Sequence, residues 1–430
     1  MKRLDLFPIT TKIENNELSI ARINLKNLVD EFQTPLYIYD KATLDSSVTE
    51  YKNALASYYG THASVTYAGK AYLCTAIAQW TQLHNLTLDC TGEGEIHIAL
   101  NAKVKRENIL VHGVNKSDAD LKSAIQHAGT IVVDNLTELE RITQLFTRHS
   151  SLNLWLRLLP GVTVSTHHAH TQTGHHESKF GMTREEILQA AEFCKKNKMP
   201  LKGLHFHQGS NFRDPEPLIP AIDLALDIAK EIGFDDEWHF CPGGGWGVAY
   251  HEDELPHPSI EHYVKGVCEA VIEGCEKRNL SLPHLHLEPG RSLVACAGVA
   301  IYRVGAIKKR ENKTWVLVDG GMADNPRYAM YGARYSCLAV TGITEERSEV
   351  ISVAGPYCES GDVIFEDLPM SKLKAGDLIA VPMSGAYHLS MSSNYNGARK
   401  PAVYMLENGE AKLIQKRETL DDLSRRDVKL

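Results

Sequence analysis

Two glycine-containing turns follow two short apolar runs in the second half of the sequence. The turn at 242–247 reads Pro-Gly-Gly-Gly-Trp-Gly, and the turn at 288–291 reads Glu-Pro-Gly-Arg. Glycine lets backbone N–H groups approach an anion closely, and an arginine beside such a turn adds a charged fork that suits phosphate. The loops after strands seven and eight of an eight-stranded barrel are a common phosphate site. The two turns therefore predict a site for a phosphorylated cofactor.

A lysine follows another apolar run, in the sequence Tyr-Ala-Gly-Lys-Ala that contains Lys70. A lysine amine can form a Schiff base with an aldehyde cofactor. The ordinary alternative is a solvated surface lysine. Because the phosphate turns already predict a cofactor, we interpret Lys70 as the residue that carries it.

Histidines and a glutamate end two other runs. His205 and His207 alternate along one run, so they point to the same side of a strand. The His207 ring can stack on a flat cofactor, and Ser210 can donate to phosphate. A carboxylate such as Glu288, placed at a pyridine nitrogen, makes that ring an electron sink. A structural glutamate is the alternative for Glu288.

Metal binding is a weaker interpretation of the histidines. His205 and His207 could both be ligands, but the sequence shows no third ligand beside them, so we predict no metal. The histidine-rich stretch from His167 to His176 is interpreted as a solvated loop, with substrate gating as the alternative.

The last third of the chain adds a thiol and groups that suit a carboxylate. Cys358 lies in a turn that ends at Asp362, and a suitably placed cysteine can donate a proton. A buried inert cysteine is the commoner fate. Arg327 and Tyr331 offer a guanidinium and a phenol to a carboxylate, and a surface ion pair is the alternative.

Eight strand-like runs must position the first group of residues. Each is followed by a turn and a segment of helical length, and they span 65–68, 86–90, 109–112, 131–134, 154–158, 203–207, 238–241 and 284–288. Alternating strands and helices predict a parallel sheet, and eight units predict a closed (β/α)8 barrel of the TIM type. An open doubly wound sheet is disfavoured because no G-x-G-x-x-G turn follows the first strand.

The pattern changes after about residue 297. Strand-like runs at 314–318, 349–353, 377–381 and 402–406, with an Asn-Gly hairpin signal at 408–409, predict a β-rich second domain. We therefore expect a barrel over 36–296 and a β-rich domain over 297–430, joined by the N-terminal segment 1–35.

Bulk composition limits the class of protein. The 430 residues carry a net charge of −8, which disfavours nucleic acid or an anionic membrane as the main partner. No apolar run approaches the roughly 20 residues that span a bilayer. The nine cysteines lack paired spacing and the N-terminus lacks a signal-peptide core, so a cytoplasmic protein is expected.

The motifs occur in an order that resembles a known family. They are Tyr-Ala-x-Lys-Ala at 67–71, Ser-Lys-Phe-Gly at 178–181, His-x-His-x-Gly-Ser at 205–210, Gly-Gly-Gly at 243–245, Glu-Pro-Gly-Arg at 288–291, Cys-Glu-Ser-Gly-Asp at 358–362 and Gly-Ala-Tyr at 385–387. The set resembles the pyridoxal-phosphate decarboxylases of the alanine-racemase-like barrel fold. The stretches 320–327 and 390–396 resemble the diaminopimelate decarboxylase branch of that family.

The resemblance implies a role for each candidate residue. The implied cofactor-binding residues are Lys70, His207, Ser210, Gly244, Gly245, Glu288, Gly290, Arg291 and Tyr387. The implied substrate-binding residues are Arg291, Arg327, Tyr331, Glu359 and Tyr387. Lys70 would form the Schiff base with pyridoxal phosphate, and Cys358 would be the acid that protonates the carbanion.

The resemblance also implies an assembly and a reaction. Family members form homodimers with shared active sites, so Cys358 and Glu359 would reach into the site of a second copy. The implied reaction converts meso-diaminopimelate into L-lysine and CO2. Alternatives are a related decarboxylase of another amino acid or of a carboxylated polyamine, a barrel racemase, or a non-catalytic regulator that binds the cofactor. Tyr72 and Glu93 differ from the residues common in the family, and both bear on the choice of substrate.

Overall fold

The computed structural model describes residues 2–145, 152–161, 174, 177–234 and 236–430. The chain divides into two compact units. One contains residues 1–47, 248–257 and 293–430, and the other contains 48–247 and 258–292. No helix of the described residues is long and apolar enough to cross a bilayer. The histidines between His167 and His176 lie outside the described residues.

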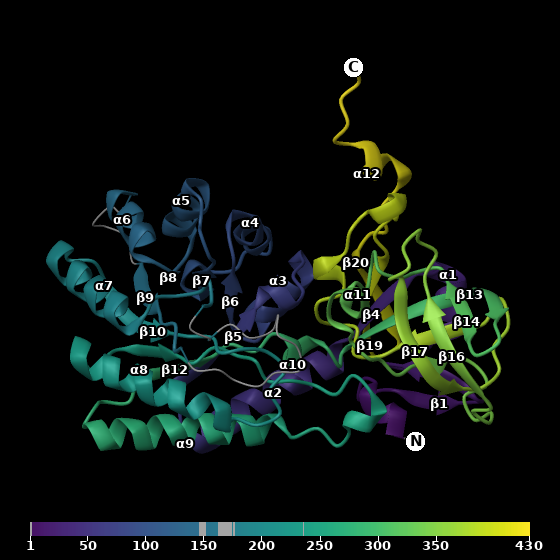
Figure 1. Ribbon diagram of the computed structural model, residues 1–430, viewed down its shortest axis with the longest axis horizontal. Coiled ribbons are helices and arrows are strands. Elements are labelled where there is room, and N and C mark those ends of the chain that lie inside the picture. The colour runs from purple at the N-terminus through teal and green to yellow at the C-terminus, as the bar shows by residue number, and fades with distance from the viewer. Residues whose placement is uncertain (1, 146–151, 162–173, 175–176, 235) are drawn as a thin grey trace. The chain divides into compact units, whose positions relative to one another are not determined.

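Eight parallel strands form a closed barrel in the unit 48–247 and 258–292 (Figure 1). They are β5 (Ala63–Ala68), β6 (Thr87–Cys90), β7 (Ile109–His112), β8 (Thr130–Val133), β9 (Asn153–Arg157), β10 (Leu201–His205), β11 (His239–Cys241) and β12 (His284–Leu287). β12 pairs with β5 and closes the ring. The predicted (β/α)8 barrel is confirmed, and the open doubly wound sheet is excluded.

Helices alternate with these strands along the chain. They are α3 (Thr75–Leu83), α4 (Glu93–Asn101), α5 (Asp118–His127), α6 (Leu136–Leu145), α7 (Arg184–Asn197), α8 (Ile219–Ile232) and α9 (Ile260–Arg278). The sequence explains their limits, as α7 shows. Thr183 caps its first turn in a capping box with Glu186, and Ile187, Ala190 and Cys194 form its buried face.

The other unit is built on a mixed sheet. Its strands run in the order β17 (Val363–Met370), β16 (Glu349–Ala354), β14 (Thr314–Val318), β13 (Gly298–Lys309), β4 (Leu36–Asp40), β19 (Ala402–Glu407) and β20 (Glu410–Gln415), with β15 (Leu338–Ala339) and β18 (Leu378–Val381) off this path. β1 (Lys12–Glu14), β2 (Glu17–Ile20) and β3 (Ile23–Asn24) form a small sheet. The predicted Asn-Gly hairpin joins β19 to β20, with positive φ at both turn residues.

The N-terminal strand β4 belongs to this sheet because its two neighbours come from the C-terminal part of the chain. It pairs antiparallel with β13 and parallel with β19. The expected domain boundary between residues 296 and 297 stays a prediction. By internal contacts, β4 and the segment 248–257 group with the β-rich unit.

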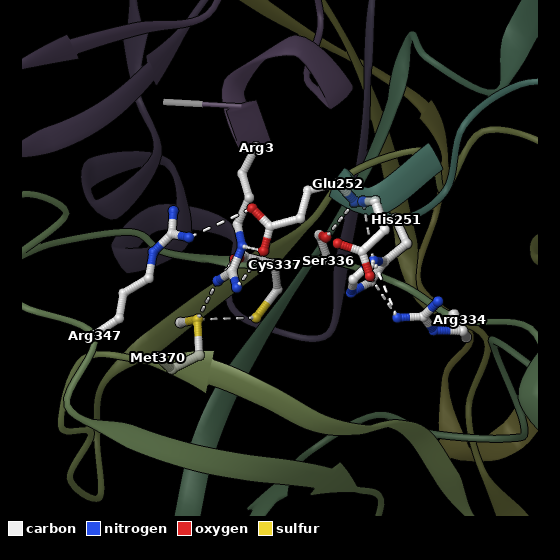
Figure 2. A network of polar contacts seen from close by, with 9 residues as sticks. Arg3, His251, Glu252, Arg334, Ser336, Cys337, Arg347 and Met370 are labelled. Carbon is white, nitrogen blue, oxygen red and sulfur yellow. Dashed lines mark hydrogen bonds and ion pairs between the residues drawn. The ribbon is translucent and has the colours of Figure 1, made fainter. Parts of the chain in front are cut away.

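A buried arginine fixes the start of the chain inside the β-rich unit. Arg3, on the short 3₁₀ helix η1 (Lys2–Leu6), is fully buried. Its Nε donates to Glu252 Oε1 over 2.8 Å, and its Nη1 donates to the Cys337 carbonyl over 3.2 Å (Figure 2). Glu252 N donates to Ser336 Oγ over 3.0 Å. These contacts hold η6 (Glu252–Glu254), which lies in the segment that follows the 242–247 turn.

We predict that Glu252→Gln lowers the free energy of unfolding by about 2 kcal/mol, because it leaves the buried Arg3 guanidinium without its anion. Asp253→Asn is the matched control, since Asp253 pairs with Arg334 at the surface, where an ion pair contributes at most about 1 kcal/mol. Urea denaturation of both variants measures the difference. Equal losses of unfolding free energy in the two variants would show that the buried Arg3–Glu252 ion pair stabilises the fold no more than the surface pair does.

Candidate active site

Backbone hydrogen bonds join the carboxyl ends of three barrel strands. Ala68 N, at the end of β5, donates to Pro289 O over 3.1 Å, and Glu288 N donates to Gly243 O over 3.0 Å. The predicted turns after β11 and β12 therefore lie beside the end of β5. Because parallel strands end at the same edge of a barrel, residues far apart in sequence meet here.

Lys70 lies at this edge, on the short 3₁₀ helix η2 (Gly69–Ala71) directly after β5. Its side chain is exposed, and it forms no hydrogen bond or ion pair with any residue that the structure describes. Its positive charge lowers the pKa of Glu288 and opposes the rise in the pKa of Asp89. The structure thus presents an accessible amine beside two buried carboxyl groups.

The glycine turn after β11 leaves no room for side chains. A Cβ on Gly244 would lie 2.0 Å from Glu288 O, and a Cβ on Gly245 would lie 2.5 Å from Gly209 O. Gly243 and Gly245 also have positive φ, 77° and 110°, which L side chains rarely adopt. Glycine at these positions lets the backbone of this turn approach its neighbours closely.

The charged and hydroxyl groups predicted for the phosphate come together. Arg291 Nη2 donates to Ser210 Oγ over 3.0 Å, although 81 residues separate them. Arg291 is 8% exposed. Gly290 packs against the end of β5, where a Cβ would lie 3.1 Å from the Cβ of Ala71. The structure therefore brings the predicted Ser210, Gly290 and Arg291 into one place with the end of β5.

Glu288 follows β12 and is buried, with one carboxylate oxygen left free. Its Oε2 lies 3.2 Å from His205 Nε2, while Oε1 is buried and forms no hydrogen bond with the described residues. Burial raises the pKa of Glu288, but His205, Lys70 and Arg157 together lower it below its ordinary value. Glu288 is therefore a charged carboxylate that presents an unused acceptor.

A second buried acid, Asp89 on β6, was missed by the sequence analysis. Burial raises its pKa well above the ordinary value, and the charge of Glu288 raises it further. Two buried carboxyl groups that interact disfavour the negative charge on each other. The charge on Glu288 therefore adds to burial in favouring the protonated form of Asp89. The only signal in the sequence was an acid inside an apolar run.

His207 lies just beyond the end of β10 and is partly exposed. Its Nδ1 accepts a hydrogen bond from Gly244 N over 3.4 Å. Burial, and then the charges of Lys70 and Arg157, lower its pKa well below the ordinary value. His207 is therefore a neutral ring beside the glycine turn, which suits stacking on an aromatic group.

His112, at the end of β7, is a further residue that sequence reasoning missed. Its ring lies 4.3 Å from that of His205, centroid to centroid. One ligand atom from each of His112, His205 and Glu288 lies within 4.8 Å of the others. The sequence suggested no third ligand for the histidines, whereas the structure places two candidates beside His205.

Arg157, at the end of β9, positions the Ser-Lys-Phe-Gly motif. Its Nη1 donates to Asp134 Oδ1 over 3.1 Å, and the same oxygen accepts from Gly181 N over 3.1 Å. The guanidinium also lies 4.4 Å from the centre of the Phe180 ring. Burial lowers the pKa of Arg157, and Asp134 opposes that effect. Arg157 was not among the predicted site residues, because a single arginine in an apolar run has no spacing signal.

These features fit pyridoxal phosphate. The free Oε1 of Glu288 matches the N–H of a protonated pyridine ring, and the neutral ring of His207 lies next to the same edge. The turn 243–245 with Ser210 and Arg291 suits the phosphate group. Lys70 supplies the amine that the cofactor's aldehyde requires.

The β-rich unit contains the other predicted residues. Arg327 begins α11 (Arg327–Tyr331) and is 7% exposed. Its Nη1 donates to Tyr335 Oη over 2.6 Å, and its Cζ lies 4.2 Å from the centre of the Tyr250 ring. No carboxylate of the described chain pairs with it. A buried guanidinium without an anion suits a ligand that carries a carboxylate.

Four predicted residues of this unit are more accessible than Arg327. Cys358 is exposed, and its backbone N donates to Asn396 Oδ1 over 2.8 Å. Glu359 is also exposed, whereas Tyr331 and Tyr387 are partly buried. Their roles remain predictions, because they lie in the other compact unit from Lys70 and Glu288.

Relatives of known sequence and structure resemble the chain over nearly its whole length. The diaminopimelate decarboxylase of Bacillus subtilis is 37% identical over 433 residues, which cover 96% of each chain. The crystal structure of diaminopimelate decarboxylase from M. jannaschii is 29% identical and superposes with a TM-score of 0.90, covering 98% of both chains. A Helicobacter pylori diaminopimelate decarboxylase mutant in complex with L-lysine is 32% identical, with a TM-score of 0.84 over 94% of this chain and 98% of that one.

The model of one protein family matches the barrel. Residues 42–295 match the pyridoxal-dependent decarboxylase, pyridoxal binding domain. That range contains Lys70, His207, the glycine turn, Glu288 and Arg291, which are the residues that the structure gathers at one edge of the barrel. The chain belongs to the pyridoxal-dependent decarboxylases.

Proposed function

We propose that this protein is a pyridoxal-phosphate-dependent decarboxylase that converts meso-diaminopimelate into L-lysine and CO2. The observation that carries the reaction type is the buried Glu288 carboxylate with its free Oε1, beside the accessible Lys70 amine. The substrate rests on the relatives, which are diaminopimelate decarboxylases at 35–37% identity. Arg327, a buried cation that lacks a carboxylate partner, supports a substrate with a second carboxylate.

Each barrel residue has a defined task in this proposal. Bound pyridoxal phosphate supplies a ring that takes up the electron pair left when CO2 departs. Lys70 would hold the cofactor through Nζ. Glu288 keeps a proton on the ring nitrogen, because its charge is stabilised by His205 and Arg157. His207 stacks on the ring. The phosphate is held by Ser210, Gly244, Gly245, Gly290 and Arg291.

Residues of the β-rich unit complete the proposal. Arg327 and Tyr331 hold the carboxylate that the product retains, with Arg291, Glu359 and Tyr387 also near the substrate. Tyr387 contacts the cofactor. The Cys358 thiol protonates the carbon that lost CO2, and its exposure leaves it free to reach a ligand. We propose a homodimer in which Cys358 and Glu359 act in the active site of the second copy. None of the nine cysteines forms a disulfide, which supports a reducing, cytoplasmic location.

The direct test is CO2 release by purified protein supplied with pyridoxal phosphate. The substrates compared are meso-diaminopimelate, lysine, ornithine, arginine and carboxynorspermidine. Release of CO2 and L-lysine from diaminopimelate alone supports the proposal. Release from another amine alone keeps the reaction and overturns the substrate, and no release from any of them overturns the enzymatic proposal.

We expect Lys70→Ala to abolish turnover and to remove the covalently held cofactor, because it removes the exposed amine whose charge acts on Glu288. Lys122→Ala, which removes an exposed lysine of α5, should leave both properties unchanged. Turnover and the visible absorbance of the cofactor after borohydride reduction measure the two effects. Substantial activity in Lys70→Ala would remove this assignment.

We expect Glu288→Gln to lower kcat by roughly 10²-fold or more, because the ring nitrogen loses the charge that keeps it protonated. Phosphate contacts are intact in this variant, so cofactor should still bind. Stopped-flow absorbance and steady-state kinetics separate binding from turnover. A variant with unchanged kcat would show that Glu288 has a structural role only.

Mixing two inactive variants tests the shared site. If Cys358 acts in the partner's site, a mixed dimer of Lys70→Ala and Cys358→Ala contains one site with both defects and one intact site. Denaturing and refolding an equal mixture should then restore about a quarter of the native activity, because half of the dimers are mixed. Mixtures that stay as inactive as the separate variants would contradict shared sites.

A further inference from the structure

Arg327 and Asp324 are buried charges of opposite sign in the β-rich unit, but they do not touch. Arg327 has no carboxylate partner among the described residues, and Asp324 is 4% exposed. An isolated charge is costly to bury. The structure therefore has to compensate the guanidinium by some route other than a direct ion pair.

A continuous set of buried contacts connects the two charges. Arg327 Nη1 lies 2.6 Å from Tyr335 Oη, and Tyr335 Oη lies 2.7 Å from His388 Nε2. His388 Nδ1 lies 3.4 Å from Tyr37 Oη, and Tyr37 Oη lies 2.9 Å from Asp324 Oδ2. Every one of these side chains is buried. We call this set the Arg327–Asp324 relay.

With a neutral His388 ring, the chemistry of the two ends sets the direction of every hydrogen bond. A guanidinium can only donate and an ionised carboxylate can only accept. Tyr335 Oη therefore accepts from Arg327 and donates its own proton to His388 Nε2. His388 then carries its proton on Nδ1 and donates to Tyr37 Oη, which donates to Asp324. All members donate toward the carboxylate, so the relay polarises along one direction.

Asp324 is ionised at neutral pH, as the relay requires. Burial raises its pKa to about 6, against hydrogen bonds that favour the charge. Its Oδ2 accepts from Tyr302 Oη over 2.6 Å, and its Oδ1 accepts from Gly321 N over 2.9 Å. Asp319 adds a repulsion that raises the pKa. A pKa near 6 leaves the carboxylate charged at pH 7.5 and above.

We propose that Asp324 is the remote counter-ion of Arg327, and that Tyr37, His388 and Tyr335 are positioning residues which orient the guanidinium for a ligand carboxylate. The inference rests on the proposed function for the identity of that ligand. Because the compensating charge acts from a distance, the other N–H groups of Arg327 stay available for binding. A direct carboxylate partner would occupy them.

Tyr37→Phe tests the proposal, because it removes one oxygen from the middle of the relay and keeps the aromatic ring. The holoenzyme is titrated at pH 7.5 with L-lysine and, separately, with cadaverine, which lacks the carboxylate. We expect L-lysine to bind roughly tenfold more weakly to the variant, since one hydrogen bond in a charged network is lost. Cadaverine affinity and kcat should change less than about twofold, whereas KM should rise with the loss of L-lysine affinity.

Tyr302→Phe is the matched control. Tyr302 donates to the same oxygen of Asp324, is equally buried and lies 3.1 Å from Tyr37 Oη, but the four contacts from Arg327 to Asp324 do not include it. It keeps every contact of the relay and only raises the pKa of Asp324, so it should weaken L-lysine binding less than Tyr37→Phe does. Asp324→Asn, which keeps the shape and removes the charge, is the second variant should Tyr37→Phe fail to fold, and it should weaken L-lysine binding in the same selective way.

Three outcomes overturn the relay: unchanged L-lysine affinity in Tyr37→Phe, equal losses in Tyr37→Phe and Tyr302→Phe, or equal losses of L-lysine and cadaverine. The wild-type turnover of meso-diaminopimelate is measured separately. A wild-type protein that binds L-lysine but releases no CO2 contradicts the proposed function and leaves the relay supported or overturned by the binding data alone.

Discussion

Glu288 is a buried carboxylate at the carboxyl end of the barrel strands, and the groups around it stabilise its negative charge. A buried carboxylate ordinarily takes up a proton. Here His205 contacts one oxygen at 3.2 Å, and Lys70 and Arg157 add positive potential. Burial and the charge of Glu288 raise the pKa of the buried acid Asp89 well above its ordinary value. Glu288 therefore keeps its charge, and its second oxygen, Oε1, forms no hydrogen bond with the described residues.

The backbone of the glycine turn after β11 packs closely against the strand end that carries Glu288. A Cβ on Gly244 would lie 2.0 Å from the carbonyl of Glu288, so the turn after β11 and the strand end that carries the carboxylate lie in direct contact. The same neighbourhood contains the Arg291 and Ser210 pair. The residues proposed to bind the phosphate and Glu288 therefore lie on adjacent strand ends, as expected where parallel strands end at one edge.

The buried charge of the β-rich unit, the Arg327 guanidinium, is stabilised in a different way. Glu288 has charged neighbours around it, whereas Arg327 is bounded by the Tyr250 ring and the Tyr335 hydroxyl. Its compensation passes through neutral groups to Asp324. A direct ion pair would stabilise the guanidinium more simply, but would leave fewer donors for a ligand. Ser336 joins the segments that carry Tyr250 and Tyr335, because its N donates to Tyr250 O and its Oγ accepts from Glu252 N. The ion pair between Arg3 and Glu252 therefore also holds the segment that carries Tyr250.

The sequence by itself determined the barrel and the residue types at its strand ends. Alternating apolar runs and helical segments predicted all eight strands, and glycines beside Arg291 predicted an anion site, because both signals are local. Only the tertiary structure decided which buried groups face one another. Asp89, His112 and Arg157 lie in apolar runs with no distinctive spacing, and the relay joins Tyr37 to residues about 290 to 350 positions later in the chain. The effect of the Glu288 charge on the pKa of Asp89, and the contacts of the relay, depend on distances that strand pairing and burial set. No local pattern in the sequence encodes those distances.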